Sequence, residues 1–216
     1  MEVIRLGTAA ESCRLKIESS NRQSIVLEGE FKPYRVRRIT GFKDMSVCEE
    51  AVLENPALQV PSFGDLKSNG LYTGLDDLSV RGRFGYDEDN FYIELKVKDD
   101  IHFNNQTPDR CFVGDSVQYA FDTLRDGRFS HLAGNSGWGD DDYRFTTALA
   151  DGRAVSFCFG AASCNRSRMF RKEYLRPEVV RCEKTKTTVY RCSIPFSYLS
   201  PLRPESGRVF GCSCLA

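Results

Sequence analysis

Acidic residues occur in four short clusters, which are the most obvious candidates for chemistry in this sequence. The clusters are Asp76-Asp77, Asp87-Glu88-Asp89, Asp99-Asp100 and Asp140-Asp141-Asp142. Closely spaced carboxylates in loops can supply some of the roughly six to eight oxygens that a calcium ion binds. None of the clusters has the ligand spacing of a dedicated calcium loop such as the EF-hand, and aspartate is also common in solvated turns. Structural calcium is one hypothesis for these clusters, and ordinary turns are the other.

Residue patterns typical of catalytic sites are missing. The sequence contains no G-x-S-x-G nucleophile elbow, no Cys–His signature and no metal-binding histidine pair. A glycosidase needs two carboxylates about 5 to 10 Å apart, and scattered acids provide such candidates by chance. The two histidines, His102 and His131, have no spacing to Met45 or Met169 that defines a pair of haem ligands. We therefore predict that the protein is not an enzyme and requires no cofactor.

The cysteines are numerous but widely spaced. Nine are present, at positions 13, 48, 111, 158, 164, 182, 192, 212 and 214, and no C-x-x-C motif occurs. Zinc ribbons and thioredoxin-like sites need that motif to bring two sulfurs together. Cys212 and Cys214 would share one face of a strand, where they could bind metal, pair with another cysteine or simply pack. We expect mostly reduced cysteines that pack as small apolar side chains.

Composition excludes several classes of function. The 216 residues are 41% hydrophobic, and 30 Lys and Arg balance 30 Asp and Glu to a net charge of zero. A neutral chain lacks the positive field that attracts nucleic acids, and the nine basic residues between positions 165 and 191 alternate with acids. No apolar run approaches the roughly 18 residues of a membrane helix, and the first residues lack the pattern of a signal peptide. We predict neither a nucleic acid nor a membrane as partner.

Side chains in this chain would be positioned mainly by β-strands. In residues 90–98, Phe91, Ile93, Leu95 and Val97 alternate with polar side chains, which predicts a strand with one buried face. The preceding turn residues indicate a hairpin of residues 78–86 and 90–98. Further strands are expected at 116–122, 142–149, 154–159, 179–183, 187–194 and 208–214. Strands separated by turns predict an all-β fold, an antiparallel sandwich or barrel.

The first 55 residues differ from the remainder. Short strands are expected at 2–6, 13–18, 24–27 and 34–39, followed by a helical turn at 46–54. The stretch from Asn55 to Pro61 then breaks any helix. About 55 residues bury only a marginal core. We therefore predict a β-rich N-terminal appendage, or the tail of a preceding domain, at 1–55, followed by a sandwich domain at 56–216.

Three segments within the predicted strands resemble the family 9 carbohydrate-binding modules, which occur on xylanases. They are Asp76-Asp77-Leu78-Ser79 with Tyr86-Asp87 and Phe91-Tyr92; Val97 to His102 with Gly114-Asp115-Ser116-Val117-Gln118; and Tyr190 to Phe196 with Phe210-Gly211. The resemblance covers roughly residues 50–216 and rests on the order of the segments, because each motif alone is weak. It implies an antiparallel, jelly-roll-like β-sandwich, apparently without its last strands, that binds sugar without changing it. Such modules can also carry structural calcium.

The resemblance also implies specific site residues. In the family, a sugar is held between two aromatic rings and fixed by polar side chains. The first ring corresponds to Phe112, and a sugar-binding carboxylate is replaced by Gln118. The family's basic residue corresponds to Thr146, so Arg144, two positions earlier on the same strand face, is the expected substitute.

The second aromatic ring of the family would lie beyond residue 216. Three explanations stay open: the sequence is a fragment, Trp138 in the loop 134–140 supplies the ring, or sugar binding has been lost. The resemblance implies an oligo- or polysaccharide partner of plant type, such as xylan or cellulose, and an extracellular or periplasmic location. The alternative is a structural or protein-interaction domain, in which the edge left by a missing strand supports a dimer.

Overall fold

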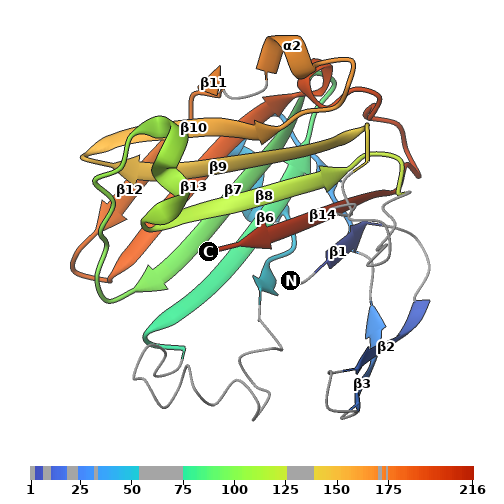
Figure 1. The fold of residues 1–216 in the computed structure, drawn as a ribbon, viewed down its shortest axis with the longest axis horizontal. Coiled ribbons are helices and arrows are strands. Elements are labelled where there is room, and N and C mark those ends of the chain that lie inside the picture. The colour runs from blue at the N-terminus through green and yellow to red at the C-terminus, as the bar shows by residue number, and fades with distance from the viewer. Residues whose placement is uncertain are drawn as a thin grey trace.

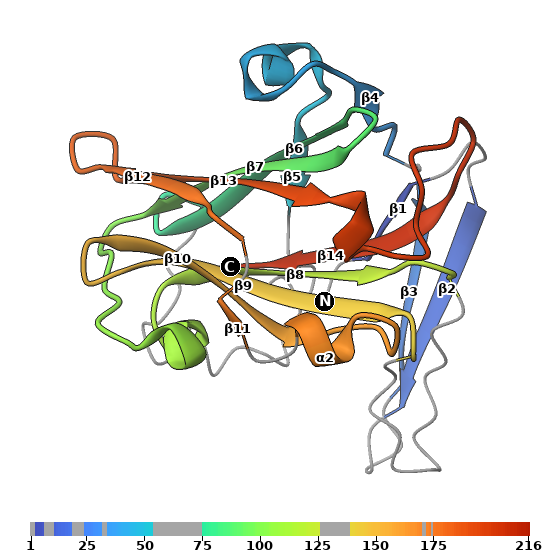
Figure 2. The same cartoon turned by 90° about the horizontal axis from the view of Figure 1, so that it is seen from above.

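The computed structural model describes residues 3–6, 11–18, 24–31, 34–53, 75–125, 139–169, 172–173 and 175–216. Two β-sheets pack face to face (Figure 1), and they are seen as two layers in Figure 2. The predicted all-β sandwich is therefore confirmed. Among the described residues, no helix is both long and apolar enough to cross a membrane.

Sheet I has six strands. Their order across the sheet is β1 (Val3–Leu6), β14 (Phe210–Leu215), β8 (Ser116–Asp122), β9 (Asp142–Ala150), β10 (Arg153–Gly160) and β11 (Lys172–Glu173). All of these neighbours are antiparallel. Its outer face is partly covered by the 3₁₀ helix η4 (Pro108–Val113), whose buried Cys111 packs against Ala148, Ala150, Val155 and Phe157.

Sheet II is built around the predicted hairpin. Its order is β12 (Glu178–Cys182), β13 (Thr187–Pro195), β7 (Asn90–Asp99), β6 (Leu78–Tyr86) and the short parallel strand β4 (Arg37–Arg38), and β5 (Ala51–Leu53) also pairs with β6. Two further helical turns are η5 (Phe196–Tyr198) and α2 (Arg166–Met169). The hairpin is confirmed to within one residue at its C-terminal end.

The hairpin turn is fixed by one aspartate. Asp87 Oδ1 accepts hydrogen bonds from the backbone N–H groups of Asp89 at 2.8 Å and Asn90 at 2.7 Å. Its other oxygen accepts a hydrogen bond of 2.6 Å from the Tyr92 hydroxyl. Aspartate serves here as a turn residue because its side chain satisfies backbone donors within the turn.

The core lies between the sheets. Phe91, Ile93, Leu95 and Val97 are buried, as the alternation predicts. Tyr92 on the opposite face is also buried, because Phe42 of the 3₁₀ helix η1 (Phe42–Val47) packs against its ring with centroids 5.1 Å apart.

A row of alternating charges crosses the outer face of sheet II. The strand register places Arg191 between Glu178 and Glu94, and Glu94 between Arg191 and Arg83. The Glu94 side chain is 6% exposed, and its Oε2 lies 2.8 Å from Arg191 Nε. Its Oε1 lies 3.9 Å from both Arg83 Nη1 and Lys96 Nζ. The hydrogen bond to Glu94 raises the pKa of Arg191. The ion pair between these two side chains therefore links β13 to β7.

The N-terminal region contributes strands to both sheets. β1 pairs with β14, while β4 and β5 pair with β6. β2 (Glu11–Glu18) and β3 (Ser24–Phe31) form a separate two-stranded sheet, which lies to the side of the sandwich in both views (Figures 1 and 2). The division at residue 55 stays a prediction.

Two expectations about this region need correction. The helical turn expected at 46–54 is wrong over most of its described part: η1 ends at Val47, and residues 51–53 join the ladder of β6, where tertiary pairing outweighs local preference. The edge of β14 is also not open over its first four residues, because β1 pairs with it from Phe210 to Ser213.

Of the nine cysteines, eight have described side chains and none of these eight is in a disulfide. Five are buried, at positions 48, 111, 158, 192 and 212. Burial raises the pKa of the Cys158 and Cys192 thiols to about 12, so both are protonated at neutral pH.

Candidate functional site

A pocket of about 380 Å³ lies at one end of the sandwich and collects residues from both sheets. We call it the acidic pocket, because three aspartates and no lysine or arginine are among the described residues that line it. Its polar and aromatic lining comprises Asp77, Asp99, His102, Phe112, Asp115, Gln118 and Tyr190. Phe112 and Gln118 both line this pocket, and their predicted role in sugar binding stays a prediction.

Phe112 is held by the packing of η4. The edge of its ring contacts the face of Phe159, with centroids 5.0 Å apart and planes at 89°. Buried Cys111 anchors the same turn on sheet I. The Phe112 side chain nevertheless stays 45% exposed. The ring is thus positioned by the fold and still accessible to a ligand.

The loop that connects η4 to β8 is tied together by Asn104. Its Nδ2 donates to the carbonyl oxygens of Cys111 at 2.8 Å and Asp115 at 3.0 Å. A Cβ on Gly114 would lie only 2.8 Å from Asn104 Cγ, so a glycine is required for this close approach. Asp115 accepts a hydrogen bond from the backbone N–H of Phe103, and its own N–H donates to the Phe103 carbonyl at 3.1 Å. These two bonds fix Asp115 at the entry to β8.

Negative charge accumulates inside the acidic pocket. Burial raises the pKa of Asp99, and the charge of Asp115 raises it further. Burial likewise raises the pKa of Tyr190, with added contributions from Asp115 and Asp99. His102 Nε2 lies 3.1 Å from the Leu149 carbonyl oxygen and must donate to it, whereas Nδ1 is 3.8 Å from Asp115 Oδ2. The pocket therefore presents hydrogen-bond acceptors, which suit hydroxyl groups.

Arg144 lies near this site but does not line it. Gln118 is directly opposite Thr146 in the ladder, and Arg144 is opposite Ala120, one row further along the same outer face. Thr146 is fully buried, and its Oγ1 has no hydrogen-bond partner among the described residues. Trp138 lies outside the described residues, so its predicted role stays a prediction.

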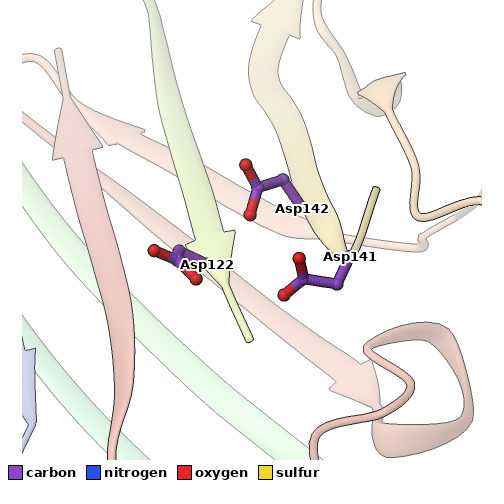
Figure 3. Close-up of side chains that lie close together, drawn as sticks. All are labelled: Asp122, Asp141 and Asp142. Carbon is purple, nitrogen blue, oxygen red and sulfur yellow. The ribbon is translucent and has the colours of Figure 1, made fainter. Parts of the chain in front are cut away.

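Three carboxylates meet at the other end of β8. Oxygens of Asp122, Asp141 and Asp142 lie within 4.8 Å of one another, and Figure 3 shows the three side chains converging from the end of β8 and the start of β9. Asp141 Oδ2 accepts hydrogen bonds from Thr123 Oγ1 at 2.8 Å and from Leu124 N–H at 2.9 Å. Asp142 Oδ2 accepts one from Gly139 N–H at 2.5 Å. We call this group the aspartate triad.

The aspartate triad is the one group with metal-ligand spacing among the described residues. Carboxylate oxygens are ligands that calcium prefers, so the donor set fits such an ion. The sequence pointed to Asp141 and Asp142 but missed Asp122, which is brought to them by the pairing of Asp122 with Asp142 across β8 and β9. The Asp87 cluster instead forms a turn, and Asp76 forms an ion pair with Lys98.

Sequence reasoning missed other residues of the acidic pocket. Asp99, His102 and Tyr190 come from β7, the loop after it and β13, and strand ends that are remote in sequence bring them together. The signal available was the position of Asp99 at the end of β7, which becomes useful only once the neighbouring strands are known.

No family model and no curated protein matches the sequence. Two solved structures of a family 9 carbohydrate-binding module from Caldicellulosiruptor kristjanssonii are similar. The complex with cellotriose has 13% sequence identity and a TM-score of 0.54 over 83% of this chain and 73% of that one. The complex with glucose has 14% identity and a TM-score of 0.46, and the match covers 66% of this chain and 60% of the chain in that complex. The similarity to the cellotriose complex shows that the chain has the β-sandwich fold of the family 9 carbohydrate-binding modules.

Proposed function

We propose that the protein is a non-catalytic carbohydrate-binding module, and that the acidic pocket binds plant-type polysaccharide chains or their ends. The observation that carries this proposal is the meeting of Phe112 and Gln118 in one pocket beside three carboxylates. Aromatic rings stack on the C–H faces of sugars, while carboxylate and amide oxygens accept hydrogen bonds from hydroxyl groups. The similar modules are complexed with glucose and cellotriose, which supports the same class of ligand.

The rim of the acidic pocket provides further apolar surface. Phe103 is 63% exposed, and its backbone is bonded to Asp115 in the pocket lining. Ile101, near Phe103 in the same loop, and Val113, at the end of η4, are also exposed. Exposed apolar side chains next to a polar pocket are typical of binding surfaces. In this proposal Phe103 extends the contact to neighbouring sugar units, and Trp138 remains the alternative second ring.

The proposed function also includes a location for the protein and a bound calcium ion. A module of this kind acts beside a glycoside hydrolase on xylan or cellulose, outside the cell or in the periplasm. The aspartate triad holds a structural calcium ion rather than a catalytic one, because its residues lie at the opposite end of β8 from Gln118.

Isothermal titration with cello-, xylo- and manno-oligosaccharides, in the presence of calcium, tests the proposal. We expect saturable binding that Phe112→Ala weakens at least about tenfold, since an aromatic side chain contributes about 1.5–3 kcal/mol when buried. Val180→Ala, which removes a 53% exposed side chain on β12, is the control and should bind like the unmodified protein. Loss of binding to end-reduced sugars would identify recognition of chain ends.

Two results would contradict sugar binding in this pocket. The first is the absence of binding heat with every sugar while the protein is folded. The second is equal affinity of the Phe112→Ala variant and the unmodified protein. Either result would favour the alternative of a protein-interaction domain, for which the exposed side chains of Ile101, Phe103 and Val113 provide the surface.

A further inference from the structure

A second pocket, of about 370 Å³, lies at the other end of the sandwich. We call it the basic pocket. Its floor is apolar: Phe91 and Phe210 are buried, and Phe196 and Tyr86 are half-buried. The segment 202–209 closes one side of it with Leu202 and Val209 among other residues. A pocket of this size and lining is typical of sites for small molecules.

The rim of the basic pocket carries an excess of positive charge. Arg35, Arg203 and Arg208 line it, against the single acid Glu205, and all four are exposed. Among the described residues, Arg35 and Arg203 form neither an ion pair nor a side-chain hydrogen bond. Arg208 Nη2 reaches only the Thr123 carbonyl oxygen, at 3.5 Å.

This excess contrasts with the charge row of sheet II. The chain is neutral overall, and on the outer face of sheet II Arg83 lies 3.0 Å from Glu50 and Arg191 lies 2.8 Å from Glu94. The guanidinium group is a planar donor fork that matches the two oxygens of a carboxylate. Three such groups around an apolar floor therefore favour a ligand that combines a carboxylate with an apolar ring.

The two pockets are separated along shared strands. β7 runs from Phe91 in the basic pocket to Val97 in the acidic pocket, and this separation of six residues corresponds to about 20 Å. β13 and β14 also run from one pocket to the other, because one end of each strand lies near the basic pocket and the other end near the acidic pocket. A ligand in the basic pocket would thus not touch Phe112 or Gln118.

We propose that the basic pocket is a second binding site, and that its ligand is a small aromatic carboxylate. The carboxylate pairs with Arg35 and Arg203 at the rim, and the ring lies on the apolar floor formed by the aromatic side chains. The basic pocket is independent of the acidic pocket, so its ligand binds whether or not the acidic pocket is occupied.

Titration of the full chain with cinnamate, with its neutral amide and with acetate tests both halves of the site. Cinnamate should bind saturably, whereas cinnamamide lacks the charge and acetate lacks the ring, so both should bind at least about tenfold more weakly. The double variant Arg35→Gln, Arg203→Gln should lose at least about tenfold in affinity for cinnamate. Arg176→Gln, which removes an exposed arginine outside the pocket, is the matched control.

Three outcomes would overturn the proposal. The first is that cinnamate does not bind the folded protein, and the second is that the double arginine variant binds it as well as the unmodified chain does. If acetate or inorganic phosphate bound as tightly as cinnamate, the arginines would form a general anion patch. A sugar titration in the same samples separates this proposal from the first, because the double arginine variant should keep its full affinity for oligosaccharide.

Discussion

The two ends of the sandwich have pockets of nearly equal volume and opposite charge. The acidic pocket is lined by three aspartates, and the basic pocket by three arginines and one glutamate. The same strands, β7, β13 and β14, lead to both. The apolar interior is common to the two ends, and the loops determine which charge each end presents. This separation of scaffold and loop is how one fold accommodates different ligands.

The largest expected effect concerns the scaffold that the two ends share. Glu94→Ala removes the central carboxylate of the charge row and leaves Arg83, Lys96 and Arg191 without their shared partner. Breaking a buried ion pair costs about 3–5 kcal/mol, and because the arginine partners are partly exposed we expect about 2–3 kcal/mol. Urea denaturation gives this loss in the free energy of unfolding.

A suitable control for this variant is Glu88→Ala. Glu88 pairs with Arg38, but both side chains are largely exposed, and such surface pairs contribute about 0–1 kcal/mol. Both pockets of the Glu94 variant should keep their affinities below its unfolding transition. Equal losses of stability in the two variants would show that the charge row does not support the sheet.

The second largest effect should distinguish the two ends. Thr123 links the aspartate triad to the basic pocket, because its hydroxyl donates to Asp141 and its carbonyl oxygen accepts from Arg208. A chelator added to calcium-loaded protein should lower the melting temperature by about 5–10 °C, since an ion at about 100 times its Kd contributes about 2.7 kcal/mol. The chelator should also lower the affinity of the basic pocket for the aromatic carboxylate, and it should leave the affinity of the acidic pocket for sugar unchanged.

Variants within and beside the aspartate triad test where calcium binds. Asp122→Asn should abolish the response of the melting temperature to chelator. Asp140→Asn should retain it, because exposed Asp140 lies outside the triad and pairs with Arg166. A melting temperature that chelator leaves unchanged in the calcium-loaded protein would contradict the calcium proposal.

Local patterns and long-range contacts differ in how far the sequence predicts them. The β6–β7 hairpin was predictable because alternating side chains and the turn at Asp87 are neighbours in sequence. The pairing of β1 with β14 was not, because its partners are about 210 residues apart and no local pattern encodes them. Strand order also brings Asp122 to Asp142, which sequence spacing alone could not show.

The residues of the candidate sites also differ in whether local sequence or long-range strand pairing determines their position. Phe112 and Gln118 were predicted as site residues from a family resemblance that rests on the order of three motifs, and both line the acidic pocket. Arg144 lies on the same face but one row away from Gln118, which depends on register rather than on sequence distance. The basic pocket was missed entirely, since Arg35 and Arg203 are separated by most of the chain. Only the closure of the sandwich brings them together.

The smallest expected effect compares two aspartates at opposite ends of one strand. Asp87 precedes β7 at the end with the basic pocket. Burial raises its pKa, but the hydrogen bonds from Tyr92, Asp89 and Asn90 outweigh burial and hold the pKa below its ordinary value of 3.8. Asp99 ends β7 in the acidic pocket, where burial and the charge of Asp115 hold its pKa above 3.8. The two carboxylates should therefore have opposite effects on stability.

A lowered pKa stabilises the folded state above pH 3.8, and this contribution is lost as the pH falls through the folded value. Asp87→Asn should therefore be less stable than the unmodified protein at pH 7, by about 1 kcal/mol for weakened hydrogen bonds, with the difference shrinking in acid. A raised pKa has the reverse sign, because its stabilisation is complete below pH 3.8 and lost as the pH rises through the folded value. Asp99→Asn should thus equal or exceed the unmodified protein at pH 7, and this advantage should also disappear in acid.

Urea denaturation between pH 3 and 8 measures both differences, with Asp109→Asn as an exposed control on η4. The same sign for the Asp87 and Asp99 variants at pH 7 would contradict the electrostatic contrast between the two ends. Opposite signs that converge at low pH would show that the acidic pocket retains Asp99 at a cost to stability. Such a cost is expected where a charged group serves binding rather than folding, since a purely structural position would favour the neutral side chain.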